Sequence, residues 1–101
     1  MIRKGTKLVA LKDFSVTALV HWHAPMTSDL KCVIPRGTVV IAFADPVPLL
    51  GAVACVPADK ENFEQQQVPE NILEDPKFAG ISFVFSKRVV EDNFSEIAPT
   101  S

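Results

Sequence analysis

The length, composition and charge of the chain exclude several classes of protein. Its 101 residues predict a single domain over residues 1–101, and an apolar fraction of 48% argues against intrinsic disorder. Ten basic against twelve acidic residues give a formal net charge of −2, and the basic residues are scattered, so we expect no nucleic-acid partner. No apolar run approaches the roughly 20 residues of a membrane-spanning helix, and the N-terminus lacks the apolar segment of a signal peptide. We therefore expect a cytoplasmic protein with no membrane contact.

The start of the chain predicts two strands followed by a loop. Residues 6–14 (TKLVALKDF) form a largely apolar run that favours a first strand. Residues 16–23 (VTALVHWH) alternate between a mostly apolar and a mostly polar set, which is typical of a half-buried strand. Residues 26–29 (MTSD) follow a proline and are mainly polar, so we expect a loop there.

Residues 38–44 (TVVIAFA) predict the central strand of the sheet. Apolar side chains occupy both parities of this β-branched and aromatic segment, which is typical of a strand covered on both faces. The preceding residues 35–37 (PRG) have the composition of a turn, and residues 30–34 alternate like another strand. We therefore expect this turn to join the two strands as a hairpin.

The second half of the chain predicts two further strands and some helix. Residues 51–56 favour a strand, and residues 78–86 form a strongly amphipathic one with a bend or bulge at Gly80. The polar residues 58–67 predict either a solvated loop or a short exposed helix, because a single phenylalanine there has little to bury. Residues 68–74 predict one helical turn.

The C-terminal residues complete a mainly β prediction. Residues 87–97 favour a charged turn followed by a short strand or helix. Five to seven short strands at roughly ten-residue spacing, with one short helix or 3₁₀ turn, predict a small barrel or sandwich.

Two fragments of the sequence resemble those of SH3 domains. Residues 10–14 (ALKDF) resemble the ALYDY segment that opens an SH3 domain, and residues 68–72 (VPENI) resemble the VPSNY segment of its 3₁₀ turn. Residues 35–40 stand where that fold has a turn and its following strand. The resemblance implies a small SH3-like barrel with extra strands. It does not imply polyproline binding, because Lys12 and Ile72 replace ligand-contacting aromatic residues and the chain has no tyrosine.

The residues with reactive side chains do not form a recognisable catalytic motif. Cys32 and Cys55 make no Cys-x-x-Cys pair, and in a cytoplasmic protein they are expected as reduced, buried thiols rather than a disulfide. Their apolar neighbours would raise the thiol pKa, which disfavours a nucleophile–base pair with histidine. We therefore expect no enzyme and no cofactor.

The pair His21 and His23 is the strongest candidate for metal binding. On a strand, residues two apart point the same way, so the two imidazoles would share a face and could hold Zn²⁺ or Cu²⁺. The alternative is a solvated face beside Trp22, which would anchor the core. A small metal- or ligand-binding protein is therefore the alternative function.

The segment at residues 45–50 (DPVPLL) is the strongest candidate for a protein contact. An exposed apolar loop marks an interface with a partner or a second copy. The alternative is that its leucines fold back and plug one end of a barrel. The leading prediction is a non-enzymatic protein-interaction or self-association module, whose partner-binding surface joins Trp22 to Val47, Leu49 and Leu50.

Overall fold

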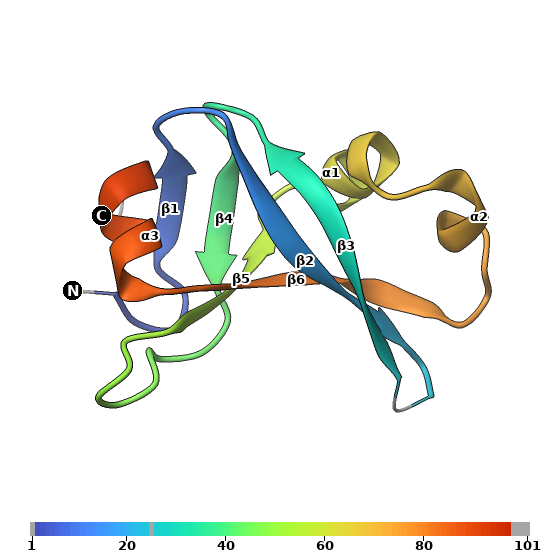
Figure 1. The fold of residues 1–101 in the computed structure, drawn as a ribbon, viewed down its shortest axis with the longest axis horizontal. Helices are drawn as coiled ribbons and strands as arrows, with labels where there is room; N and C mark the ends of the chain where they lie inside the picture. The colour runs from blue at the N-terminus through green and yellow to red at the C-terminus, as the bar shows by residue number, and fades with distance from the viewer. Residues whose placement is uncertain (1, 25, 98–101) are drawn as a thin grey trace.

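Seven antiparallel strands form one open sheet in the computed structural model, which describes residues 2–24 and 26–97 (Figure 1). The mainly β fold expected from the sequence is confirmed. The strands are β1 (Lys7–Ala10), β2 (Phe14–Trp22), β3 (Thr27–Ile34), β4 (Val39–Ala42), β5 (Val53–Pro57), β6 (Phe78–Phe85) and β7 (Phe94–Glu96). In the same residues the helices are α1 (Lys60–Gln67), α2 (Glu70–Leu73) and α3 (Lys87–Asn93). None of these helices is long and apolar enough to cross a membrane.

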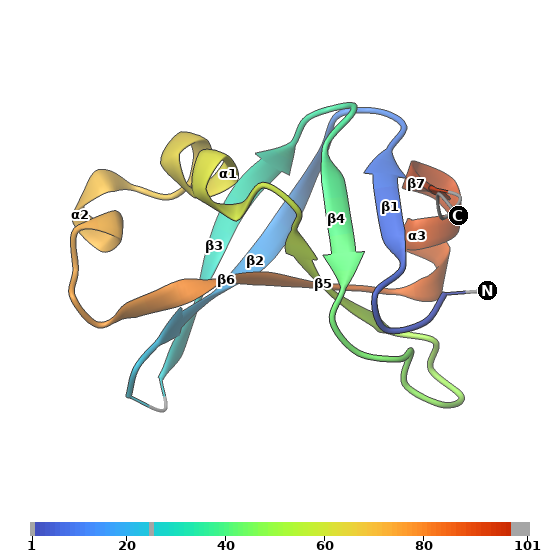
Figure 2. The same ribbon diagram turned by 180° about the vertical axis from the view of Figure 1, so that it is seen from behind.

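The strands follow the order β3-β2-β6-β5-β4-β1-β7 across the sheet, so β3 and β7 are its edges. The longest pairing joins β2 to β3, from Phe14 opposite Ile34 to His21 opposite Thr27. Figure 2 shows β6 running along the length of the molecule, with α1 and α2 near one end and α3 near the other. Helices α1 and α3 therefore lie at opposite ends of the sheet.

The hairpin expected at the turn of residues 35–37 is wrong, because β3 pairs with β2 and not with β4. The turn does form, but its backbone bonds to the end of β1. Gly37 N donates to Ala10 O, and Ala10 N donates to Thr38 O, both at 2.9 Å. These bonds direct the chain along β1, so β4 pairs with β1 and β5. Residues 27–29, expected in a loop, belong to β3.

Strand β4 is neither central nor covered on both faces. The middle strand of the sheet is β5, and β4 ends at Ala42 rather than at residue 44. Val40 and Ala42 are buried, whereas Val39 and Ile41 are half-buried and Phe43 is exposed. An apolar residue on the outer face of a sheet can stay partly exposed, so apolar residues at both parities do not prove that both faces are covered.

The core lies on one face of β6, where Ile81, Phe83 and Phe85 are fully buried. Helix α1 covers this face through Phe63, whose ring meets that of Phe83 edge-on at 5.4 Å between centroids. Asp59 caps the helix, since its side chain accepts a hydrogen bond from Asn62 N at 3.3 Å. The sequence expectation that the lone phenylalanine had little to bury is wrong, because its partner is twenty residues further along the chain.

The bulge expected at Gly80 is confirmed. The pairing of β2 with β6 shifts between His21, opposite Gly80, and Trp22, opposite Phe78. Gly80 has a φ of 142°, and a Cβ there would lie 2.5 Å from Lys60 Nζ. Only glycine fits this position without displacing the lysine, which also donates to Ala79 O at 3.5 Å.

Candidate interaction surface

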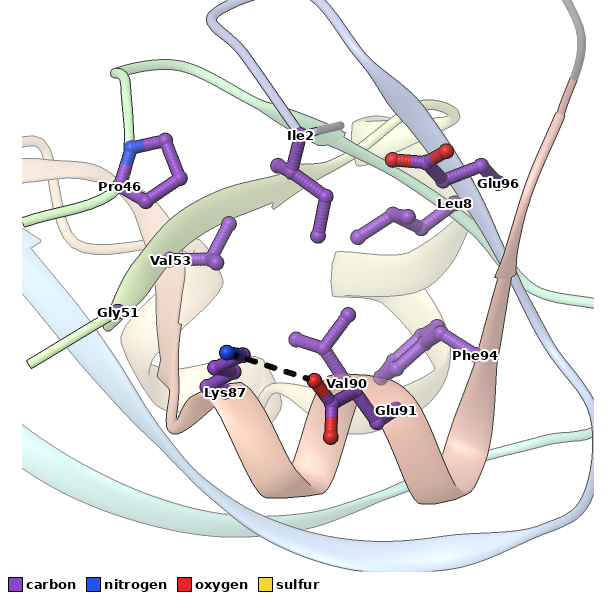
Figure 3. Close-up of a pocket in the computed structure, with 10 residues that line it drawn as sticks. All are labelled: Ile2, Leu8, Pro46, Gly51, Val53, Lys87, Val90, Glu91, Phe94 and Glu96. Carbon is purple, nitrogen blue, oxygen red and sulfur yellow. Dashed lines mark ion pairs between the residues drawn. The ribbon is translucent and has the colours of Figure 1, made fainter.

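An apolar pocket of about 460 Å³ lies beside helix α3 (Figure 3). We call it the α3 pocket. Its walls come from distant parts of the chain, and Figure 3 shows their side chains converging on one space. Leu8 comes from β1, Val53 from β5, and Val90 and Phe94 from α3 and the start of β7. The lining residues are Ile2, Leu8, Pro46, Gly51, Val53, Lys87, Val90, Glu91, Phe94 and Glu96.

Helix α3 holds its side of the pocket because the chain turns sharply after β6. Ser86 caps the helix by accepting a hydrogen bond from Val89 N at 3.2 Å. This start places Val90, one turn further on, over the sheet, where it is buried. Phe94 follows the helix and packs its ring on those of Phe14 and Phe85, at 5.2 and 5.0 Å between centroids. The floor of the pocket is therefore continuous with the core.

Gly51 brings the opposite wall close to α3. It has a φ of 68°, and a Cβ built on it would lie 3.1 Å from Lys87 Cβ. A side chain at this position would push the lysine, and with it the helix, away from the wall. Glycine therefore sets the width of the pocket at this point.

Charged side chains stand at the rim of the α3 pocket. Lys87 Nζ lies 3.9 Å from Glu91 Oε1 one helical turn away, and both side chains are largely exposed. Glu96 also lines the rim. An exposed ion pair of this kind contributes little to the stability of the fold. Lys87 and Glu91 can therefore separate and contact a ligand at little cost in stability. The rim can thus contact polar atoms beside an apolar group in the pocket.

A leucine loop projects from the edge of the α3 pocket. We give this name to residues 46–50, which include Val47, Leu49 and Leu50. The loop is closed by Val47 N donating to Ala52 O at 3.0 Å and Gly51 N donating to Val47 O at 2.8 Å. Leu49 and Leu50 have relative exposures of 106% and 76%, so neither side chain plugs an end of the sheet. Leu49 also holds a left-handed φ of 72°, which is rare for a non-glycine residue.

Trp22, the other residue expected on the partner-binding surface, lies elsewhere. It ends β2 and is half-buried, with its ring edge-on to that of Phe78 at 6.5 Å between centroids. In Figure 1 the end of β2 and the β4–β5 connection stand in opposite halves of the molecule. The structure therefore brings Val47, Leu49 and Leu50 together, but does not bring Trp22 to them.

His21 and His23 are in different surroundings. His21 is half-buried, and its Nε2 lies 2.6 Å from the Oγ of Ser82 on the neighbouring strand β6. Strand β2 ends at Trp22, so the alternation that placed both imidazoles on one face does not extend to His23, which is exposed. Across residues 2–24 and 26–97, no group of three or more histidine, cysteine or acidic side chains is placed to hold a metal ion. The geometry gives the histidine pair no third ligand in these residues.

The two cysteines are free and buried, as the sequence predicts. Burial raises the pKa of both thiols, and that of Cys55 to about 12. Both are therefore protonated at neutral pH and poor nucleophiles.

A second cleft of about 580 Å³ lies between the turn at residues 35–37 and helix α1. Arg36, Asp59, Asn62 and Gln66 are among its lining residues, and all four are exposed. Groups that water already solvates gain little from a ligand, so the α3 pocket is the better candidate site.

No protein-family model, no curated protein and no solved structure matches the chain. The resemblance to SH3 domains therefore stays a prediction. In the structure, residues 10–14 run from the end of β1 to the start of β2, and residues 68–72 run from the end of α1 into α2.

Proposed function

We propose that this chain is a non-enzymatic protein-interaction domain that binds a short apolar segment of a partner protein. The contact surface consists of the α3 pocket and the leucine loop. One observation carries the proposal: Pro46, the first residue of the leucine loop, and Gly51, which directly follows the loop, are themselves walls of the pocket. The loop and the pocket therefore form one continuous apolar surface.

The two parts of this surface suit different roles in binding. The pocket, with a volume of about 460 Å³, has room for an apolar side chain of the partner, which would be desolvated there as interface anchors are. The exposed side chains of Leu49 and Leu50 would cover the partner backbone beside that anchor. Covering them removes apolar area from water, at roughly 25 cal/mol per Å². In the free chain these leucines are left in water, which costs solubility and so favours a function for them.

Three further observations support the rest of the proposal. The protonated, buried thiols and the apolar lining of the pocket favour binding over catalysis. Two buried free cysteines suit a reducing compartment, in keeping with a cytoplasmic protein. The SH3-like architecture is supported by the position of residues 10–14, which run from the end of β1 to the start of β2, and by the helical turn at residues 70–73.

Selection of short random peptides on the immobilised domain tests this function. We expect the selected peptides to share one large apolar side chain, and we expect the double variant Leu49→Asp with Leu50→Asp to bind them at least about tenfold more weakly. Both positions are exposed and aspartate tolerates the left-handed backbone at position 49, so the variant should fold like the wild type.

The matched control is the double variant Leu11→Asp with Met26→Asp. It carries the same charge change on exposed apolar residues outside the leucine loop. We expect it to bind the selected peptides like the wild type. Equal binding by the loop variant, or equal loss in the control, would show that the surface is not the one proposed. Fluorescence anisotropy measures the affinities.

A further inference from the structure

Strand β3 is an edge of the sheet whose backbone can pair with another strand. It pairs with β2 on one side, and the strand order places no further described strand on the other. Trp22 N donates to Met26 O at 3.3 Å, which makes 22 and 26 a hydrogen-bonded pair of this hairpin. Val33 N instead donates away from β2, to Gln67 Oε1 of helix α1 at 3.2 Å.

These two bonds fix which residues of β3 point outward. Hydrogen-bonded and non-hydrogen-bonded pairs alternate along an antiparallel hairpin. Even-numbered residues of β3, such as Leu30, therefore bond to β2. Odd-numbered residues, such as Asp29 and Lys31, direct their N–H and C=O groups away from β2, in line with the outward N–H of Val33. The backbone of Asp29 and Lys31 is thus available to a second strand beyond the edge.

The side chains of this edge are complementary to themselves. Asp29 and Lys31 have opposite charges, are both exposed, and stand two residues apart on the same face of the strand. If a second copy of β3 pairs antiparallel about Leu30, Asp29 of each copy lies opposite Lys31 of the other. A shift of the two-fold axis to Asp29 or to Lys31 would instead place like charges opposite each other, which destabilises a sheet. The charge pattern therefore selects one register.

We propose that two copies of this chain associate through β3, antiparallel and centred on Leu30. Asp29 and Lys31 of opposite copies form hydrogen-bonded pairs, and the two Leu30 residues face each other as a non-hydrogen-bonded pair. The sheet then continues from one molecule into the other, and the edge that β3 presents is no longer open to unrelated strands. Gln67 limits the pairing at Val33, so the contact is short and its affinity weak.

This interface is separate from the proposed partner surface. The β2–β3 hairpin lies away from the β4–β5 connection that carries the leucine loop (Figure 1). A dimer joined at β3 would leave both α3 pockets uncovered. The dimer can therefore form whatever these pockets bind.

Charge reversal tests both the interface and its register. Asp29→Lys and Lys31→Asp each place like charges opposite each other in a symmetric dimer, whereas the double variant Asp29→Lys with Lys31→Asp restores opposite pairs. An equimolar mixture of the two single variants also restores them, but only in mixed dimers. Sedimentation equilibrium from about 20 µM to about 1 mM at low salt covers the range expected of so small a contact.

We expect the wild type to approach dimer mass within this range. Each single variant should associate at least about tenfold more weakly, and the double variant and the mixture should return to within about threefold of the wild type. A wild type that stays monomeric, single variants that associate like the wild type, or a failure of both restorations would overturn the proposal. Loss of the dimer on Leu49→Asp with Leu50→Asp, but not on Asp29→Lys, would overturn it and assign self-association to the leucine loop.

Amide hydrogen exchange supplies a second readout. In the dimer, exchange at the Asp29 and Lys31 amides should slow as concentration rises. The Leu30 amide already bonds to β2, so its exchange should stay unchanged. Concentration-independent exchange at Asp29 and Lys31 would contradict the pairing.

Discussion

Helices α1 and α3 have similar sequence features but different roles in the structure. Each is short, is capped by an oxygen side chain, and carries one lysine–glutamate pair, with Nζ and Oε1 3.9 Å apart in both. Helix α1 inserts Phe63 against Phe83 and holds Glu64 at 12% side-chain exposure. Helix α3 inserts the smaller Val90 beside a pocket and leaves Glu91 at 61% exposure.

The difference shows how one kind of helix can complete a core or border a binding site. The size of the apolar residue that faces the sheet decides how much space is filled. The exposure of the lysine–glutamate pair decides whether its charged groups are held within the fold or remain accessible to a ligand. The helix that fills less space borders the proposed site.

The largest expected effect comes from shortening the apolar residue of each helix. Phe63→Ala should lower the free energy of unfolding by about 3–5 kcal/mol, because it leaves a cavity over Phe83. Val90→Ala should lower it by about 1–2 kcal/mol, since fewer methyl groups are lost and the residue already borders open space. Urea unfolding measures both. Equal losses would contradict the claim that α1 fills more of the core than α3 does.

A smaller effect is expected at Gly51, the residue that sets the width of the α3 pocket. Gly51→Ala should destabilise the fold by about 1 kcal/mol, because alanine is strained at positive φ and its Cβ crowds Lys87. It should also weaken the binding of selected peptides. Ala52→Gly, a neighbouring change outside the pocket lining, is the control for loop flexibility. Unchanged binding with Gly51→Ala would show that the wall position is unimportant.

The smallest effect is the pH dependence of stability that comes from Glu64. Burial raises the pKa of Glu64, against the opposing effects of Lys60 and of a backbone hydrogen bond from Ile81. Stability from the protonated form is therefore fully present below the pKa of the unfolded chain, and is lost as pH rises through the pKa of the folded state. Glu64→Gln should flatten this decline in mildly acidic solution.

Glu91→Gln is the matched control, because it makes the same substitution on an exposed residue of α3. The two profiles come from thermal unfolding across the acidic range. A profile that changes no more with Glu64→Gln than with Glu91→Gln would contradict the assignment of the buried carboxylate to α1.

The sequence predicted local structure well and pairing poorly. Alternation identified β2 and β6, because period two follows directly from burial of one face. It could not show that β3 pairs with β2 and not with β4, since hydrogen bonds between Gly37, Thr38 and Ala10 decide that choice. It also missed the burial of Phe63, because an isolated apolar residue carries no periodic signal.

The candidate site was predicted only in the part that is local in sequence. Val47, Leu49 and Leu50 were identified because apolar residues in a proline-rich connection are conspicuous. The pocket was missed because its walls come from β1, β5 and α3, and no spacing relates them. The one available signal was Ser86, a helix-capping residue type three positions before Val89 and four before Val90, which places an apolar pair on a short helix.

The central claim is that the α3 pocket and the leucine loop act as one binding surface. The most direct test is an amide chemical-shift map of the wild-type chain titrated with a selected peptide. The account predicts that the largest shifts fall together on Leu49, Gly51, Lys87 and Val90. Shifts confined to β3, or gathered around Trp22 and Phe78, would contradict it.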